Sequence, residues 1–136
     1  METKELWKMP TAKVEHVVFI DKWDDLILNE IGICYRRRIL FDYYQKDKIY
    51  NAGVAVEGDQ LYKYTAASFS LLPNYYSGML VEHVNSEWLN KFLEKDRYRQ
   101  SWPVTHLALH IDNYGIFEFI AATFKILEVK EGPLEK

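Results

Sequence analysis

The stretch "VTHLALHID", from Val104 to Asp112, constrains the fold more than any other part of the chain. Apolar side chains alternate in it with smaller or polar ones. The two sets are Leu107, Leu109 and Ile111 on one side, and His106, Ala108, His110 and Asp112 on the other. Alternation with a period of two is typical of a strand between an apolar core and a more polar face. The chain therefore contains sheet, and imidazoles line one of its faces.

The residues that follow this strand are compatible with two structures. "NYGIFEFIAATFKILEV" can form a helix over 114–122, with Ile116, Phe119 and Ile120 on its apolar face, and then a strand over 123–129. It can also form a hairpin around 113–115 that pairs His110 with Glu118. Periodicity alone does not distinguish the two, because short apolar runs suit both a helix and a buried strand.

Other elements follow from local patterns. Alternation and β-branched residues predict strands over 13–21 and 79–84, and a hairpin whose turn is Gly58-Asp59. Asp21 as a cap and Gly32 as a stop predict a short helix between them. An apolar stripe predicts a second helix over 87–95, capped by Ser86. Residues 1–12 are expected to form a loose arm.

Composition limits the class of protein. The 136 residues, 49% of them hydrophobic, are enough for one domain with its own core. The formal net charge of −3 excludes a general nucleic-acid-binding surface, and no apolar stretch approaches the roughly 18 residues of a membrane span. The single cysteine, Cys34, permits no internal disulfide and fits a reducing compartment, so we expect a cytoplasmic location without membrane association.

A short basic run, Arg36-Arg37-Arg38, has two interpretations. It can be solvated surface charge, since Asp42 follows closely. If the run is a strand, Arg36 and Arg38 share one face and could bind an anionic ligand. Arg36 and Arg38 are therefore candidate ligand-binding residues.

"VTHLALHIDNYGIFEFIAATFKILEVKEGP" resembles the start of the second module in the vicinal oxygen chelate superfamily, which includes glyoxalase I, methylmalonyl-CoA epimerase and extradiol dioxygenases. "MLVEHV" resembles the strand that closes the first module, and "VEHVVFIDKWDDL" resembles its opening. The resemblance implies an α+β fold in which βαβββ modules form a curved mixed sheet, and it favours the helix over 114–122. It implies a single domain over 1–136, with the first module at 13–85, a linker helix at 86–103 and an incomplete second module at 104–136.

The resemblance also implies a metal site. Carried over residue by residue, the ligands would be His16, Glu82 and His106, holding one divalent ion of Zn, Ni, Mn or Fe. Two imidazoles and a carboxylate suit such ions and leave coordination positions open for substrate oxygens. His110, on the same face as His106, would help to line the ligand cup. The strand register could instead turn His83 inward, although we expect His83 at the surface.

The chain stops before the strands that would supply a fourth ligand in that family. We therefore expect a small-molecule-binding protein of the vicinal oxygen chelate type, without catalysis or with an undefined activity. The first alternative is a metal-dependent lyase, isomerase or dioxygenase with a His/Glu/His site. The second is a protein-partner-binding inhibitor or immunity-type protein. A sheet that ends early has an open edge, which predicts a homodimer.

Overall fold

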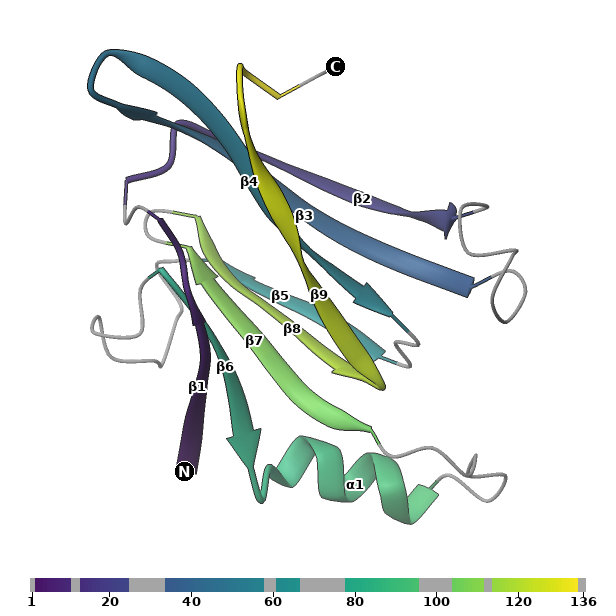
Figure 1. Cartoon of the computed structure of the whole chain (residues 1–136). Helices are drawn as coiled ribbons and strands as arrows, with labels where there is room; N and C mark the ends of the chain where they lie inside the picture. The colour runs from purple at the N-terminus through teal and green to yellow at the C-terminus, as the bar shows by residue number, and fades with distance from the viewer. Residues whose placement is uncertain are drawn as a thin grey trace. The chain divides into compact units, whose positions relative to one another are not determined.

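In the computed structural model of the chain, nine strands and one helix make up the regular structure of the described residues (Figure 1). The structure describes residues 2–10, 13–24, 34–57, 61–66, 78–95, 104–111 and 114–134, without the side chains of 2, 20–24 and 34–36. The strands are β1 (Glu2–Lys8), β2 (His16–Asp24), β3 (Cys34–Gln45), β4 (Lys48–Glu57), β5 (Leu61–Ala66), β6 (Met79–Val84), β7 (Thr105–Ile111), β8 (Gly115–Ala121) and β9 (Thr123–Glu131). The helix is α1 (Glu87–Lys95).

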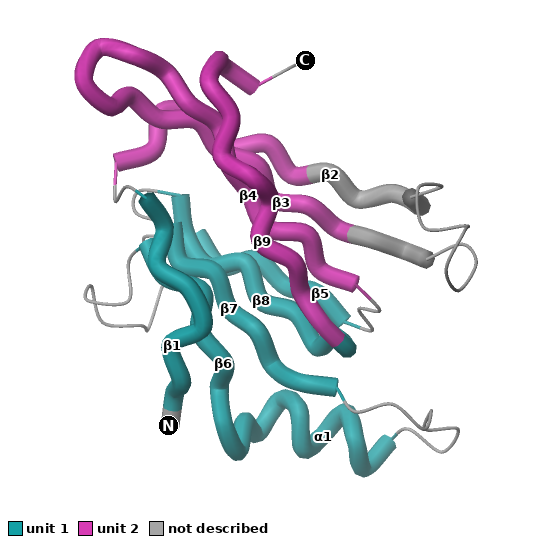
Figure 2. Tube along the Cα trace, viewed as in Figure 1, with its two compact units in different colours: residues 1–12, 60–122 teal, residues 13–59, 123–136 magenta. Residues whose placement is uncertain are grey.

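Two compact units divide the chain, and they are interleaved in sequence (Figure 2). Unit 1 comprises Met1–Ala12 and Gln60–Ala122, and unit 2 comprises Lys13–Asp59 and Thr123–Lys136. Each unit contains one antiparallel sheet, in the strand order β1-β6-β7-β8-β5 for unit 1 and β2-β3-β4-β9 for unit 2. The predicted α+β fold with βαβββ modules and a curved mixed sheet is therefore wrong, because the described chain is almost entirely antiparallel strand.

The residues after β7 explain that error. They form a β7–β8 hairpin instead of the helix expected over 114–122, with His110 opposite Ile116 and Ala108 opposite Glu118. β8 is buried on both faces except at Glu118. A strand buried on both faces is a nearly continuous apolar run, which also satisfies helical spacing. The alternative hairpin was correct in type, and its register differed by two residues, which leaves every side chain on the same face.

Three other local predictions are wrong. Residues 1–12 are not a loose arm, since β1 pairs with β6 through a bulge between Glu5 and Trp7. The helix expected after Asp21 is contradicted at its start, where β2 continues to Asp24, and the rest of that segment lies outside the described residues. β4 and β5 do not form a hairpin, because β4 pairs with β3 and β9 while β5 pairs with β8.

The strand over 79–84 and the helix over 87–95 are confirmed as β6 and α1. Asn85, with a φ of 58°, turns the chain between them. Ser86 caps the helix alone, since its Oγ accepts the Leu89 N–H at 3.1 Å. That bond satisfies one of the backbone donors that a helix start leaves unpaired. No helix among the described residues is long and apolar enough to cross a membrane.

Both faces of the unit 1 sheet follow the alternation seen in the sequence. Leu107, Leu109 and Ile111 of β7 are fully buried on one face. The opposite face carries Ala108, which packs with Val81 and Ile116 in an apolar cluster. His106 and His110 lie on this second face, on either side of Ala108, and both are buried. The second face is therefore apolar in the middle of the sheet and polar where β7 begins.

Unit 2 is organised around the β3–β4 hairpin. Lys46 and Asp47, with φ values of 51° and 69°, form a two-residue turn of the kind that matches strand twist. Gly53 of β4 faces a crowded backbone, because a Cβ there would lie 2.5 Å from the Ile39 carbonyl oxygen.

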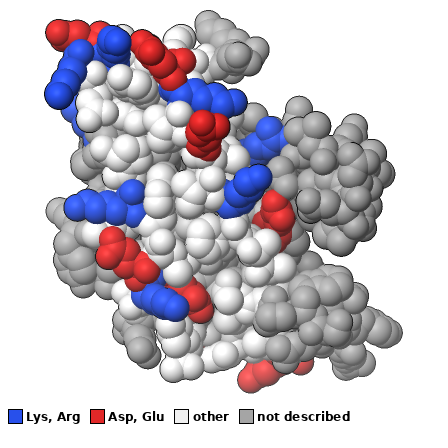
Figure 3. Space-filling view, viewed as in Figure 1, with Lys and Arg blue, Asp and Glu red and all other residues white. Residues whose placement is uncertain are grey.

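On the face in Figure 3, basic and acidic side chains of the described residues are intermixed, and neither sign forms a continuous patch.

Candidate metal centre

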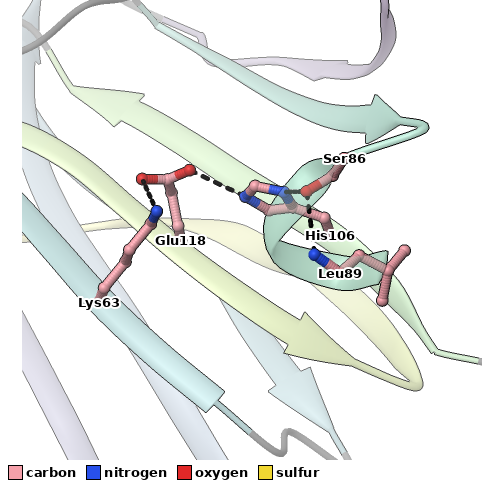
Figure 4. A network of polar contacts seen from close by, with 5 residues as sticks. All are labelled: Lys63, Ser86, Leu89, His106 and Glu118. Atoms are coloured by element: carbon pink, nitrogen blue, oxygen red, sulfur yellow. Dashed lines mark hydrogen bonds and ion pairs between the residues drawn. The ribbon is translucent and has the colours of Figure 1, made fainter. Parts of the chain in front are cut away.

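A chain of polar side chains links α1 to β8 in unit 1 (Figure 4). His106 of β7 is at its centre: Nδ1 lies 2.6 Å from Ser86 Oγ, and Nε2 lies 2.8 Å from Glu118 Oε1. The other carboxylate oxygen, Glu118 Oε2, lies 3.8 Å from Lys63 Nζ. Four elements therefore contribute to one group: α1 through its cap, and β5, β7 and β8.

Strand register brings these side chains together. Glu118 is opposite Ala108 on β7 and opposite Lys63 on β5. His106 is two residues from Ala108, so His106 and Glu118 form a diagonal pair on one face of the sheet. Diagonal neighbours are far enough apart that only long or aromatic side chains meet. The pairing therefore depends on the reach of a glutamate and an imidazole.

Both ring nitrogens of His106 have a hydrogen-bond partner: Nε2 lies beside the Glu118 carboxylate, and Nδ1 lies beside the Ser86 hydroxyl. Ser86 Oγ in turn accepts the Leu89 N–H. Each polar atom in this network of side chains then has a partner, as buried polar groups require. The network connects the first turn of α1 to the sheet.

His83 of β6 adds a second imidazole beside this chain. Its ring centroid lies 4.6 Å from that of His106, and the residue is 2% exposed. Its Nδ1 is buried and has no hydrogen-bond partner among the described residues. A buried polar atom without a partner costs free energy, so it marks a position where a ligand could bind. His83, His106 and Glu118 each offer one ligand atom, and these atoms lie within 4.8 Å of one another.

Burial and neighbouring charges set the protonation of these groups. Desolvation, and then the nearby His106, lower the pKa of His83 from 6.5 to about 4. Burial raises the pKa of Glu118, but the hydrogen bond from His106 and the charge of Lys63 outweigh it, so the net shift is downward. At neutral pH the group therefore presents a neutral His83 imidazole and an ionised carboxylate.

Two side chains cover the group. The indole of Trp88 on α1 meets the His106 ring edge-on at a centroid distance of 4.9 Å. Lys63 Nζ lies 4.4 Å from the centroid of the same indole. His83 and His106 are buried, and Glu118 is nearly so, whereas the Lys63 side chain is 46% exposed. Among these residues, Lys63 is therefore the most exposed to solvent.

This arrangement permits two kinds of chemistry. Two imidazoles and a carboxylate are a ligand set for a divalent transition metal. Ser86, His106 and Glu118 also form a serine–histidine–carboxylate chain, which is the connectivity of a nucleophilic triad. Ser86 is 2% exposed, however, and its Oγ is already the acceptor for the helix cap. A substrate carbonyl has no access to that oxygen, so the metal interpretation is the better supported.

Only one of the ligands indicated by the resemblance lies in this group. His106 is a member, but Glu82 is paired with Leu107 and belongs to the other face of the sheet. His16 lies in unit 2, where its side chain is 73% exposed and its Nδ1 is 3.0 Å from Asp42 Oδ1. The expectation of a surface His83 is wrong, and the alternative register that turns it inward is confirmed.

Glu118 was missed as a site residue because a helix over 114–122 separates it from His106. The hairpin alternative contained the necessary signal. In any antiparallel pairing that places Ala108 or His110 opposite Glu118, the carboxylate shares a face with His106. Parity along "MLVEHV" likewise places His83 on the face of Met79 and Val81.

The predicted ligand-binding residues are placed as follows. His110 is buried on β7, on the same face as His106. Arg38 is half-buried on β3, and the side chain of Arg36 lies outside the described part of the structure. Their role in binding a small molecule stays a prediction, as does the homodimer.

In comparisons with protein-family models, curated proteins and solved structures, nothing matches the chain. Nothing in these comparisons identifies a vicinal oxygen chelate protein, so that resemblance stays a prediction. The case for function therefore depends on the geometry of the group in unit 1.

Proposed function

We propose that this protein binds one divalent transition-metal ion through His83, His106 and Glu118. The observation that supports it is the cluster itself: three side chains of suitable chemistry, two of them buried, with ligand atoms within 4.8 Å of one another. The proposal keeps the His/His/carboxylate chemistry that the sequence indicated and replaces two of the three residues.

Protonation supports the proposal. Metal ligands must be deprotonated, so a site that holds neutral imidazole and ionised carboxylate at neutral pH releases few protons on binding. His83, with its pKa lowered to about 4, and Glu118, with its pKa lowered by His106 and Lys63 despite burial, meet that condition. The same shifts keep His83 and Glu118 deprotonated below neutral pH, so protonation of His83 should weaken metal binding only as pH approaches its pKa of about 4.

The hydrogen bond from α1 supports the proposal as well. A ligating histidine usually donates its other ring N–H to an oxygen, which fixes the ring and raises its basicity. If His106 binds the ion through Nε2, its Nδ1–H can donate to Ser86 Oγ, 2.6 Å away. The Leu89 N–H already fixes that oxygen. Ser86 would then position a ligand in addition to capping the helix.

The ligand set favours Zn²⁺. Ligand atoms bonded at about 2.1 Å to a tetrahedral ion lie about 3.4 Å apart, so the 2.8 Å His106–Glu118 contact must open by about half an ångström. Imidazole and carboxylate suit Zn²⁺, and Ni²⁺, Mn²⁺ and Fe²⁺ are the competitors. Three protein ligands leave a fourth position for water. Burial of the group favours a tightly held ion over turnover of a large substrate.

Titration of the metal-free chain with Zn²⁺, by calorimetry and by competition with a chromophoric chelator, tests the proposal. Glu118→Gln keeps the shape of the side chain and removes its charge, and His83→Ala removes an imidazole. Each should weaken binding by at least about 100-fold, because loss of a residue that only orients a ligand already costs about 10- to 100-fold. Glu82→Gln and His16→Ala remove the ligands that the resemblance indicated, and they should change affinity by less than about threefold. Loss of binding in this second pair, or no binding to the unaltered chain, contradicts the proposal.

A further inference from the structure

We infer that Lys63 controls metal entry to the site formed by His83, His106 and Glu118. Its ammonium is paired with the Glu118 carboxylate, and a bound ion would replace it as the positive charge beside that carboxylate. This inference depends on the proposed function, since it concerns regulation of the same site. It makes the affinity for metal depend on the charge of a half-exposed lysine outside the ligand set.

The position of Lys63 in the sheet supports the inference. It lies on β5, which is an edge strand of unit 1, and the register places it directly opposite Glu118 on β8. Figure 4 shows the side chain extending to the carboxylate, where Nζ is 3.8 Å from Oε2. The ligand residues themselves are buried or nearly so, whereas the Lys63 side chain is 46% exposed. Lys63 therefore lies on the edge strand beside Glu118, where an ion arriving from that exposed edge would meet it.

Trp88 holds the ammonium in that position. Nζ lies 4.4 Å from the indole centroid, and the same indole contacts His106. Cation–π contacts and ion pairs of half-exposed groups are weak, because water competes for the charge and screens it. The ammonium can therefore leave when an ion binds, at a cost large enough to lower metal affinity several-fold. Solvent can hydrate it on the exposed side of β5.

Charge counting shows why the ammonium must move. Glu118 and Lys63 together have no net charge. A divalent ion with one carboxylate and two neutral imidazoles has a net charge of +1, so the ion and the Lys63 ammonium repel each other across a few ångströms. Binding is therefore coupled to displacement of Lys63. Such coupling is reciprocal: the factor by which a bound ion weakens the contact of the ammonium is also the factor by which the ammonium weakens metal binding. Removing the lysine charge should therefore strengthen metal binding by that factor.

Lys63→Met removes the charge and keeps an unbranched apolar stem against Trp88, while Lys63→Arg keeps the charge. In the Zn²⁺ titration, Lys63→Met should bind about five- to tenfold more tightly than the unaltered chain, and Lys63→Arg should stay within about twofold. A gain in Lys63→Arg equal to that in Lys63→Met would show that packing is the cause and would overturn the inference.

A second measurement follows the lysine directly. Brief acylation with an amine-reactive ester, read by peptide mass spectrometry, should label Lys63 faster when Zn²⁺ is added to the unaltered chain. Lys48, which also lies 3.8 Å from a glutamate, Glu131, but in unit 2, should show no change. If Zn²⁺ binds through Glu118 and His83 but Lys63→Met has unchanged affinity, the inference is wrong and the proposed function stands. If no variant binds Zn²⁺, both are wrong.

Discussion

Each unit of this protein contains one histidine hydrogen-bonded to a carboxylate, and the two pairs have nearly the same length. His106 Nε2 lies 2.8 Å from Glu118 in unit 1, and His16 Nδ1 lies 3.0 Å from Asp42 in unit 2. The pairs differ in what surrounds the imidazole. His106 is buried and bonded through both ring nitrogens, whereas the His16 side chain is 73% exposed.

The burial of the two carboxylates differs in the opposite direction, because the carboxylate beside the exposed histidine is the more deeply buried one. Asp42 is buried and also accepts the Leu134 N–H at 3.3 Å, so it fastens the C-terminal segment to β3 with or without His16. The Glu118 side chain is 13% exposed, and its polar partners among the described residues of unit 1 are His106 and Lys63. Distance alone therefore does not identify a functional pair. Burial of the imidazole, a second imidazole nearby and a half-exposed lysine beside the carboxylate distinguish the pair in unit 1.

Replacing each histidine by alanine should give the largest contrast. His106→Ala removes the imidazole that contacts Ser86 Oγ and Glu118 Oε1 in a buried region and creates a cavity under Trp88, so the unfolding free energy should fall by about 3 kcal/mol. His16→Ala removes an exposed side chain from Asp42, which keeps its bond from Leu134, and should cost less than about 1 kcal/mol. Urea denaturation measures both. Equal losses would mean that the two pairs have the same structural role.

Acidification should sharpen the contrast through His83. Its pKa is about 4 in the folded chain, lowered by desolvation and by His106, against an ordinary value of 6.5. Between these values the unfolded chain binds a proton that the folded chain does not, so stability falls as pH falls from 6.5 towards 4. The total loss is roughly 3 kcal/mol. Glu118, whose pKa is also lowered, acts in the same direction at lower pH.

Urea denaturation from neutral pH to about pH 4 measures this slope. His83→Asn should flatten it, since asparagine does not titrate in this range. An unchanged slope in that variant would show that His83 is protonated in the folded chain as readily as in the unfolded one.

The smallest expected effect concerns the cap. Ser86→Ala removes the acceptor for the Leu89 N–H and the partner of His106 Nδ1, and should lower the unfolding free energy by about 1 to 2 kcal/mol. Thr105→Val is the control. It removes the hydroxyl that donates to the Ala121 carbonyl at 3.5 Å, and it should change the unfolding free energy by less than about 0.5 kcal/mol. If the two losses are equal, neither the cap nor the link to His106 contributes measurably to stability.

Sequence reasoning predicted those elements whose pattern is local. β6, β7, α1 and the Ser86 cap follow from alternation, from an apolar stripe and from a serine before it. The face of β7 that carries His106 and His110 was also predicted correctly. In each case the deciding residues are neighbours in the chain, so their spacing alone specifies the structure.

Features that depend on long-range pairing were not predicted. β8 is an apolar run because both of its faces are buried, and nothing local shows that two faces are covered. β1 owes its regular structure to β6, which follows some 75 residues later in the sequence. The cluster of His83, His106 and Glu118 requires both the β7–β8 hairpin and the inward face of β6. The family pattern placed a helix after β7, so it did not bring Glu118 beside His106.

Because the two units are interleaved in sequence, they acquire their strands at different times during synthesis. The chain crosses between the units at Ala12–Lys13, Asp59–Gln60 and Ala122–Thr123. Unit 1 has all its strands once Ala121 has been made, whereas unit 2 waits for β9 to pair with β4. The hairpin of β3 and β4 therefore has an open edge on the ribosome until the last strand emerges, and open edges are where nascent chains associate wrongly. β9 carries Lys125, Glu128 and Lys130, whose charges oppose such pairing once it is in place.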